Sequence, residues 1–239
     1  MPPETDGRAE GTAEGLAAAT GNAAFVLSLR ERGVRDTAVL RAMERVPRER
    51  FAPPALSAHA RQDIALPLAC GQTMSAPSVV AAMLGALDMA PGARVLEVGT
   101  GTGYVTALLM RLGAAHVRSL ERYDALARTA RQNLGRDLND ATVELADGLS
   151  PEAVRGERFD RILLNGSLEA LPPHLPAALE PGGRLVAGLW TGRASRLLLL
   201  TRDGAAAFGR SEGATLRLGP LTPGRARAAA RIAFTSAMT

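Results

Sequence analysis

The stretch VLEVGTGTGY places three glycines, Gly99, Gly101 and Gly103, between an apolar run and a segment with helical periodicity. Glycines at a strand-to-helix turn tolerate positive φ and let a ligand approach the backbone, while the helix N-terminus offers free N–H groups. A dinucleotide fingerprint would need a glycine where this chain has Tyr104, and no Gly-Lys-Ser/Thr ending of a P-loop is present. The loop therefore predicts a binding site for a nucleotide-type ligand. It matches neither of these two phosphate-binding motifs.

Three acids accompany this loop at the ends of successive apolar runs. Glu97 lies in the strand-loop junction, Glu121 follows Gly101 by twenty residues, and Asp147 with Gly148 closes the third run. Ligands of open α/β sheets bind at the carboxyl ends of the strands, so these carboxylates would face the same crevice. Each acid alone could be a helix cap or a solvated strand end, but three of them at successive strand ends favour a ligand bound in this crevice.

This arrangement resembles motif I of the class I S-adenosylmethionine-dependent methyltransferases. The resemblance implies S-adenosyl-L-methionine as cofactor, held around the three glycines and Glu97. It also implies that Glu121 accepts hydrogen bonds from the ribose hydroxyls, and that Asp147 beside Gly148 holds the adenine amino group.

A second motif stands upstream of the glycine loop. The passages VPRERF, ALP-x-x-x-GQTMSAP-x-x-VAAML and FDRILLNG resemble the protein-L-isoaspartate (D-aspartate) O-methyltransferases, and the similarity extends from about Phe25 to Leu189. GPLTPGRA, near residue 220, is similar to the closing turn of that family more loosely. The resemblance implies a catalytic position for Ser75 and isoaspartyl peptides or proteins as partners. It places three further residues beside the sulfonium: Gln72, Thr73 and Met74.

The chemistry of such a reaction explains why a serine would suffice. An isoaspartyl α-carboxylate is already ionised near pH 7 and can attack an activated methyl group without a general base. The protein must supply in-line placement and exclude water, and a hydroxyl that donates a hydrogen bond to the carboxylate would help to place it. The alternative is that Ser75 caps a helix that begins between Ser75 and Ser78, with Pro77 in its first turn.

The chain departs from the family pattern at positions on the acceptor side: Arg61, Ala69, Cys70 and the run Asn165-Gly166-Ser167. Cys70 is expected to be a small buried filler. These departures leave other acceptors open, such as an aspartate of a modified peptide or tRNA, and a non-catalytic S-adenosylmethionine-binding regulator is a further alternative.

The hydrophobic pattern of the chain after Pro91-Gly92 predicts the strands and helices that would position these residues. Short apolar runs alternate with helical stretches, and runs this continuously apolar are typical of strands buried on both faces of a parallel sheet. We therefore expect a doubly wound, mostly parallel α/β sheet of the Rossmann-like methyltransferase class with an N-terminal helical extension. The expected strands are ARVLEVG, HVRSLE, TVELAD, DRILLNG, GRLVAGLW and SRLLLLTRDG, and the expected helices cover residues 104–112, 124–134 and 173–179.

Upstream of this core, helices are expected from Asn22 to Gly33, from an N-cap at Asp36 to about Pro47, and after Ser75. Residues 48–74 show no sustained hydrophobic periodicity, so we expect an irregular segment that runs over the surface. The predicted organisation is a flexible tail (1–20), a helical extension carrying GQTMSAP (21–90), a cofactor-binding core (91–225) and a C-terminal tail (226–239).

Composition narrows the classes of function. The chain has 239 residues, a net charge of +4, no lysine, one cysteine and 3% aromatic residues. Acids are interspersed with the arginines, so no nucleic acid partner is expected. His59, His116 and His174 lack ligand spacing, so no metal is expected. MPPETDGRAEGTAEG lacks the features of a secretory signal, and a monomeric cytoplasmic protein without membrane association is expected.

Overall fold

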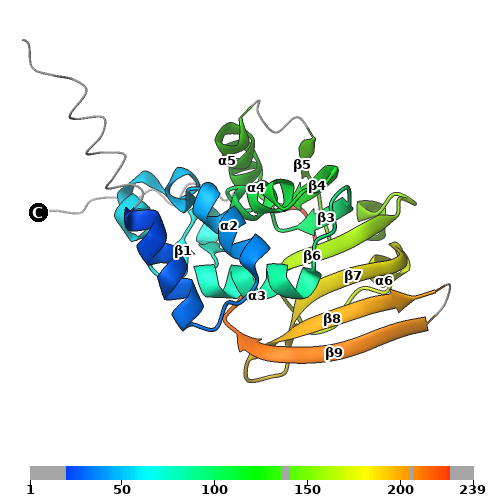
Figure 1. Ribbon diagram of the computed structural model, residues 1–239. Helices are drawn as coiled ribbons and strands as arrows, with labels where there is room; N and C mark the ends of the chain where they lie inside the picture. Colours follow the sequence, from blue (N-terminus) through cyan, green and yellow to red (C-terminus); the bar gives the residue numbers. More distant parts are fainter. Residues whose placement is uncertain (1–19, 136–139, 205–206, 227–239) are drawn as a thin grey trace, which may run out of the picture.

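A seven-stranded sheet organises the chain in the computed structural model, which describes residues 20–135, 140–204 and 207–226. The strand order is β5-β4-β3-β6-β7-β8-β9. Figure 1 shows the sheet running from β9 at the bottom to β5 at the top. The strands are β3 (Arg94–Val98), β4 (His116–Glu121), β5 (Ala141–Leu145), β6 (Phe159–Leu168), β7 (Leu179–Trp190), β8 (Ser195–Asp203) and β9 (Ala207–Leu216).

The five strands from β5 to β7 are parallel, whereas β8 and β9 are antiparallel to their neighbours. From β3 the chain adds β4 and β5 on one side and then returns to add β6 on the other. The strand order thus reverses at β3, which makes its carboxyl end a topological switch point and a natural ligand crevice. The predicted mostly parallel, doubly wound sheet is confirmed.

Alternate residues of the central strands enter two separate hydrophobic clusters, one on each face of the sheet. On β3, Val95 belongs to one cluster and Leu96 to the other, and Leu163 and Leu164 of β6 divide in the same way. Successive side chains of a strand point to opposite faces, so burial of both requires cover on both faces. The apolar runs of the core therefore encode the layered fold directly.

Helices flank the sheet, and a capping residue marks the start of one of them. Residues 20–31 are helical. The next helix, α2 (Thr37–Arg45), is capped by Asp36, which accepts hydrogen bonds from the backbone N–H of Ala38 (2.8 Å) and Val39 (3.0 Å), as predicted. The other α-helices are α3 (Pro77–Leu87), α4 (Tyr104–Arg111), α5 (Asp124–Leu134) and α6 (His174–Ala177). No helix in the described ranges has the length and hydropathy needed to cross a membrane.

Residues 48–74 differ from the expected surface wandering. They form short 3-10 turns, η1 (Arg48–Arg50), η2 (Pro54–His59) and η3 (Ala69–Gly71), and the two-residue strands β1 (Leu66–Pro67) and β2 (Thr73–Met74). Arg48, Phe51, Ala60 and Leu66 are buried within this segment. The segment lacks periodicity because side-chain burial and polar tethers, rather than a repeating backbone ladder, hold it in place.

Two further elements depart from expectation. The predicted helix at 173–179 is only α6, because Leu179 already opens β7. Strand β9 was not predicted, since AFGRSEGATL is largely exposed and has no apolar alternation; its pairing with β8 alone defines it.

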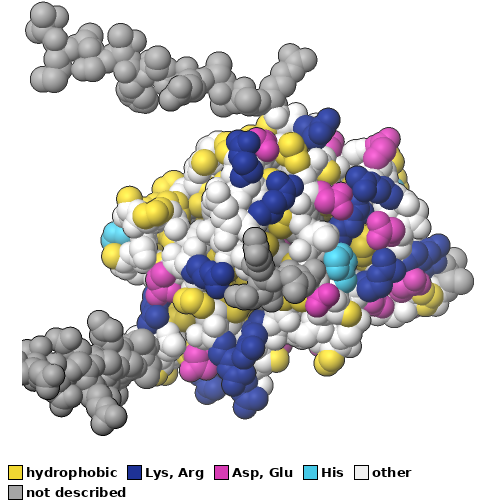
Figure 2. Space-filling model, turned by 90° about the horizontal axis from the view of Figure 1, so that it is seen from above, with side chains coloured by type: hydrophobic (Ala, Val, Ile, Leu, Met, Phe, Trp, Pro, Cys, Tyr) yellow, Lys and Arg dark blue, Asp and Glu magenta, His cyan; other side chains and the backbone are white. Residues whose placement is uncertain are grey.

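The proposed division at residue 90 stays a prediction, and residues of both parts share one hydrophobic cluster. The predicted tails lie outside the described residues, except at Thr20, which is helical, and Ala226. Basic and acidic side chains are intermixed over much of the face shown in Figure 2.

Candidate active site

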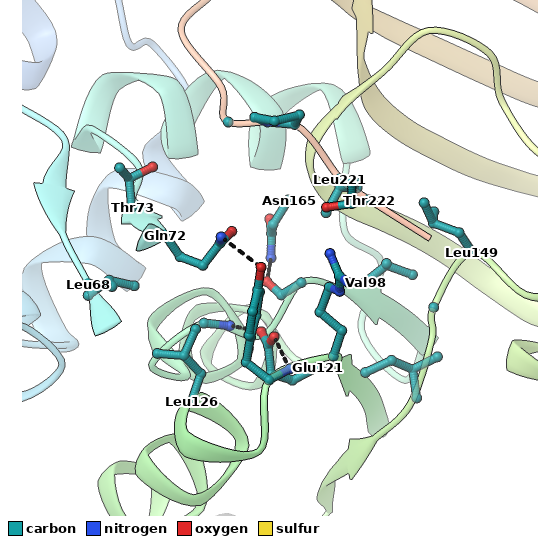
Figure 3. Close-up of a pocket in the computed structure, with 18 of the residues that line it drawn as sticks. Leu68, Gln72, Thr73, Val98, Glu121, Leu126, Leu149, Asn165, Leu221 and Thr222 are labelled. Atoms are coloured by element: carbon teal, nitrogen blue, oxygen red, sulfur yellow. Dashed lines mark hydrogen bonds between the residues drawn. The ribbon is translucent and has the colours of Figure 1, made fainter. Parts of the chain in front are cut away.

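A pocket opens at the carboxyl ends of β3, β4 and β5, where the strand order reverses. Its floor and one wall come from residues at the ends of these strands, the opposite wall from the 72–75 turn, and its roof from the 219–222 segment (Figure 3). Eight of the residues predicted from sequence line it: Gln72, Thr73, Ser75, Gly99, Gly101, Glu121, Asp147 and Gly148. Three others, Met74, Glu97 and Gly103, lie outside its lining.

Glu121 joins the glycine loop to the β4 end. One carboxylate oxygen, Oε2, accepts the Gly101 N–H at 2.8 Å, and Oε1 accepts the Tyr123 N–H at 2.9 Å. The residue is only 5% exposed, and burial raises the pKa of Glu121, although the backbone donors oppose that shift. A carboxylate has about four acceptor sites, so two backbone bonds leave capacity for hydroxyl groups of a ligand.

Asp147 and Gly148 form the wall at the end of β5. Asp147 accepts from the Leu149 N–H at 3.0 Å through Oδ1 and from the Gly224 N–H at 2.7 Å through Oδ2. A Cβ atom on Gly148 would stand 2.4 Å from Cγ1 of Val98. Only glycine therefore lets this wall pack against the end of β3.

Gly103 serves packing rather than the pocket lining. Its φ of 92° is in the left-handed region, and a Cβ atom there would stand 3.1 Å from Leu134 and 3.4 Å from Ala130 on α5. A side chain at this position would be strained and would also push the two helices apart. The third glycine thus sets the distance between α4 and α5.

Glu97 is fully buried behind the loop. Its carboxylate accepts hydrogen bonds from Ser119 Oγ at 2.6 Å, Asn165 Nδ2 at 2.7 Å and Thr106 Oγ1. Burial raises the pKa of Glu97 to about 7, despite the three donors that favour its charged form. Glu97 therefore acts on the pocket through Asn165 and the strands around it.

Asn165 is the residue of β6 that lines the pocket, and its amide points between Gln72 and Leu221 (Figure 3). Its Nδ2 donates both to Glu97 and, at 3.1 Å, to the Gly99 carbonyl. A carbonyl can only accept, so the amide nitrogen must face the loop and Oδ1 must face away from it. This departure from the family pattern thus lies at the centre of the site.

The turn that carries GQTMSAP forms the opposite wall. The β1–β2 ladder pairs Leu66 with Met74 and Pro67 with Thr73, which turns Met74 into the hydrophobic cluster and leaves Thr73 facing the pocket. Gln72 Nε2 donates to the Tyr123 hydroxyl at 3.2 Å, so the turn touches the end of β4.

The N-cap of α3 is Ala76, not Ser75, and Pro77 occupies the first helical position. The carboxylate of Asp63 instead accepts from the Ser78 N–H and Ser78 hydroxyl, both at 2.8 Å. The Ser75 hydroxyl, which makes no hydrogen bond within the described residues, is therefore not used as a cap.

Sequence reasoning assigned no site role to several lining residues: Leu68, Arg122, Tyr123, Leu126, Leu149 and the 219–222 segment. The last had a weak signal in GPLTPGRA. This segment is joined to β6 by Ser167 N–H to the Gly219 carbonyl (2.9 Å) and Leu221 N–H to the Ser167 carbonyl (2.8 Å). Chain segments distant in sequence thus close the pocket over Asn165.

The other departures from the family pattern lie outside this lining, Arg61 and Cys70 among them. Arg61 forms an ion pair with Glu49. The expectation that Cys70 is buried is wrong, because its side chain is exposed in a turn with φ of 60°. The tight η3 turn that presents Gln72 to the pocket leaves the thiol outside.

Comparison with known proteins connects this geometry to a family. The sequence model described as Protein-L-isoaspartate(D-aspartate) O-methyltransferase (PCMT) matches residues 20–224. A protein-L-isoaspartate O-methyltransferase of Rhodopseudomonas palustris (strain BisA53) is 44% identical over 204 residues, covering 85% of this chain and 94% of that protein. Another from Bradyrhizobium sp. (strain ORS 278) is 46% identical over 206 residues, with coverages of 85% and 94%.

Solved structures share the fold at lower identity. A protein-L-isoaspartate O-methyltransferase structure superposes with a TM-score of 0.72 at 23% identity, covering 85% of this chain and 66% of the other. A Plasmodium falciparum structure carrying the same enzyme name, in complex with S-adenosyl-L-homocysteine, gives a TM-score of 0.71 at 21% identity, with coverages of 83% and 97%.

Proposed function

Because the chain belongs to the protein-L-isoaspartate(D-aspartate) O-methyltransferase family, it is an S-adenosyl-L-methionine-dependent methyltransferase, and we propose that it methylates L-isoaspartyl residues of damaged proteins. The observation that supports this acceptor is the composition of one pocket. Glu121 and Asp147 supply carboxylates at one end, and Thr73, Ser75 and Asn165 supply neutral polar groups at the other. A cationic nucleoside suits the first set, and an anionic nucleophile suits the second.

The residues at the strand ends fit the proposed cofactor. Glu121 has free acceptor capacity for ribose hydroxyls, and Asp147 stands at the next strand end, where it can accept from an amino group. When bound, S-adenosyl-L-methionine supplies an electrophilic methyl group on a sulfonium. The absence of a pyrophosphate agrees with the two carboxylates, which would repel one.

The proposed mechanism needs no general base. An α-carboxylate is ionised near pH 7, so its oxygen forms the new C–O bond while the C–S bond breaks and S-adenosylhomocysteine leaves. We assign Ser75 the task of donating a hydrogen bond to the carboxylate and holding it in line. The three polar residues assigned to this end, Thr73, Ser75 and Asn165, carry no positive charge and so leave the charge of the nucleophile unneutralised.

Exclusion of water is assigned to the roof of the pocket. Leu221, held to β6 through Ser167, covers the glycine loop, and its Cδ2 lies 3.4 Å from where a Cβ of Gly99 would stand. A dry site lowers the solvation of the attacking carboxylate and prevents hydrolysis of the activated donor.

The test of this function is a matched pair of peptides that differ only in carrying isoaspartate or aspartate at one position. Purified protein is incubated with each peptide and methyl-labelled S-adenosylmethionine. Base-labile label on the isoaspartyl peptide alone is the expected result. Equal labelling of both peptides, or cofactor binding without any label transfer, would contradict the proposed acceptor.

We propose further that the enzyme works as a monomer in the cytoplasm. One chain supplies both the cofactor end and the acceptor end of the pocket, and the free thiol of Cys70 is exposed, as suits a reducing compartment. Light scattering after size exclusion tests the first point, with a dimer mass as the contrary result. Fractionation of expressing cells tests the second.

A further inference from the structure

Arg48 is a charged residue outside the pocket that is almost completely buried, at 2% exposure. It stands at the start of η1 and donates to the backbone of two distant segments. Its Nη1 donates to the carbonyl of Ala60 at 2.6 Å, and its Nη2 lies within hydrogen-bond distance of the carbonyls of Ile64 (3.2 Å), Met74 (3.4 Å) and Ser75 (2.9 Å). One guanidinium thus joins residues 60–64 to the turn that carries Ser75.

The Arg48 guanidinium contacts this turn directly, at the Ser75 carbonyl. The β1–β2 ladder ends at Met74, and α3 begins at Pro77, so Ser75 lies between two regular elements. The start of α3 is held separately, by Asp63 through Ser78. Among the described residues, the hydrogen bond that the Ser75 carbonyl accepts comes from Arg48.

The chemistry of the side chain suits this task. A guanidinium presents five N–H donors in a rigid planar fork, so it can direct its two terminal nitrogens to different segments, whereas an ammonium on a flexible stem cannot. Burial of a cation is costly, and removal of one partner of a buried polar set leaves carbonyls unsatisfied. A residue needed only to fill this space could be apolar, so the guanidinium indicates a requirement for fixed backbone geometry.

We propose that Arg48 is a positioning residue for methyl transfer, which holds the Ser75 turn at the height over the pocket that in-line attack requires. The inference rests on the proposed function of Ser75 but concerns a residue that touches neither cofactor nor acceptor. The cofactor end is tied to β3, β4 and β5, and Gln72 and Thr73 are held by Tyr123 and the β1–β2 ladder, whereas the Ser75 carbonyl is held by Arg48. Loss of Arg48 should therefore change the rate and leave cofactor affinity intact.

The experiment compares Arg48→Met and Arg48→Lys with a matched control, Arg161→Met. Arg161 is also buried, at 9% exposure, and donates to a backbone carbonyl, that of Asp88 at 2.9 Å, at the opposite end of the same helix α3. The measurements are kcat and KM for the isoaspartyl peptide, the Kd for S-adenosylhomocysteine, and the thermal midpoint. Both methionine variants should lower the thermal midpoint.

We expect Arg48→Met to lower kcat about 20-fold: misplacement of a reacting group by about 1 Å can cost up to two orders of magnitude, and a residue that acts through Ser75 should cost no more than loss of the Ser75 hydroxyl. Its Kd for S-adenosylhomocysteine should stay within twofold, and Arg161→Met should keep kcat within threefold. Arg48→Lys retains the charge but not the fork, and it provides the same comparison if the methionine variant does not fold. A kcat within threefold of wild type in the Arg48 variants would overturn the proposal.

A double-mutant cycle separates positioning from general loss of structure. If Arg48 acts through Ser75, then Arg48→Lys should reduce kcat much less in a Ser75→Ala background than in the wild type. Fully multiplicative losses would overturn the proposal. The wild-type enzyme is assayed first with both peptides, so failure of the isoaspartyl activity is distinguished from failure of the role of Arg48.

Discussion

The two ends of the pocket are constructed differently. At the cofactor end, Glu121 is the last residue of β4 and Asp147 lies two residues after β5, and these parallel strands are hydrogen-bonded in register. At the acceptor end, Ser75, Asn165 and Leu221 come from three parts of the chain that are distant in sequence. One end is placed by the register of the sheet, and the other by individual polar contacts around β6 and two irregular segments.

This contrast predicts which residues should control the affinity for the cofactor and which should control the rate of methyl transfer. A sheet with buried faces is cooperative and rigid, so substitutions at strand ends should act on the binding of the ligand that the strand ends contact. The acceptor end depends on side-chain contacts such as those of Arg48 and Asp63, each of which can be removed alone. We therefore expect variants to divide into those that weaken cofactor binding and those that slow transfer.

The largest effect is expected from Glu121→Ala. The substitution removes the proposed partner of the ribose hydroxyls. It also removes the hydrogen bond that the Gly101 N–H donates to Oε2 of Glu121. Hydrogen bonds to a charged group contribute about 1.5 to 3 kcal/mol each, so the Kd for S-adenosylhomocysteine should rise by about 300-fold, or roughly 3.4 kcal/mol. Isothermal titration calorimetry measures it.

Asp124→Ala is the control for this measurement, because that acid begins α5 nearby but pairs with Arg128 at the surface. Its Kd should stay within twofold of the wild type. A Glu121→Ala variant that binds the ligand as tightly as the control would show that the two ends of the pocket are not specialised as described.

The next effect concerns Glu97, which links the two ends through Asn165. Its pKa is raised to about 7 in the folded protein from a reference of 4.5, so the folded state binds a proton more tightly than the unfolded state does. Its contribution to stability is therefore present below pH 4.5 and is lost as the pH rises through 7. Between pH 5 and 8 the loss is on the order of 2 kcal/mol.

Glu97→Gln should remove this pH dependence, because a neutral amide has no proton to lose and can still hydrogen-bond Ser119 and Asn165. Urea unfolding of both proteins at pH 5, 6, 7 and 8 gives the difference in unfolding free energy. Parallel curves for the two proteins across this range would contradict the raised pKa. Glu144→Gln, which changes a carboxylate with a lowered pKa, provides the contrasting case.

An effect of comparable size is expected from Ser75→Ala, which tests the acceptor end directly. Loss of one directional hydrogen bond to the nucleophile should lower kcat by roughly 30-fold, or about 2 kcal/mol in the barrier. The Kd for S-adenosylhomocysteine should change less than twofold. Comparable losses in both quantities would mean that the two ends are not independent, and Ser78→Ala, which alters the α3 start instead, serves as the control.

The smallest effect is expected at Tyr104, whose buried hydroxyl has no hydrogen-bond partner among the described residues. Tyr104→Phe keeps the ring contact with Phe51, at 5.6 Å between centroids, and removes an unsatisfied polar atom. Unfolding free energy should stay within about 1 kcal/mol of wild type, with any change toward greater stability. A loss above 2 kcal/mol would reveal an essential role for the hydroxyl.

The cofactor end could be predicted from sequence because its signals are local. A glycine loop after an apolar run, with acids at the ends of the next two runs, needs only the regular order of strands to place them together. The helices at 37–45 and 124–134 were equally readable, from the cap at Asp36 and from apolar periodicity. Glu97 and Gly103 belong to the same motif, yet whether they face the ligand or the interior depends on how α4, α5 and β6 pack.

The sequence by itself determined the order of the strands from β3 to β8, the parallel core, the glycine loop and the motif that carries Ser75, since hydrophobic periodicity and short motifs are encoded by neighbouring residues. Tertiary structure alone decided that Arg48 reaches the Ser75 carbonyl, that Asn165 bridges Glu97 and Gly99, and that residues 219–222 cover the pocket. Those contacts join segments separated by 27 to 68 positions. No local pattern specifies which buried donor meets which distant carbonyl, because that choice is made only when the packed layers bring them together.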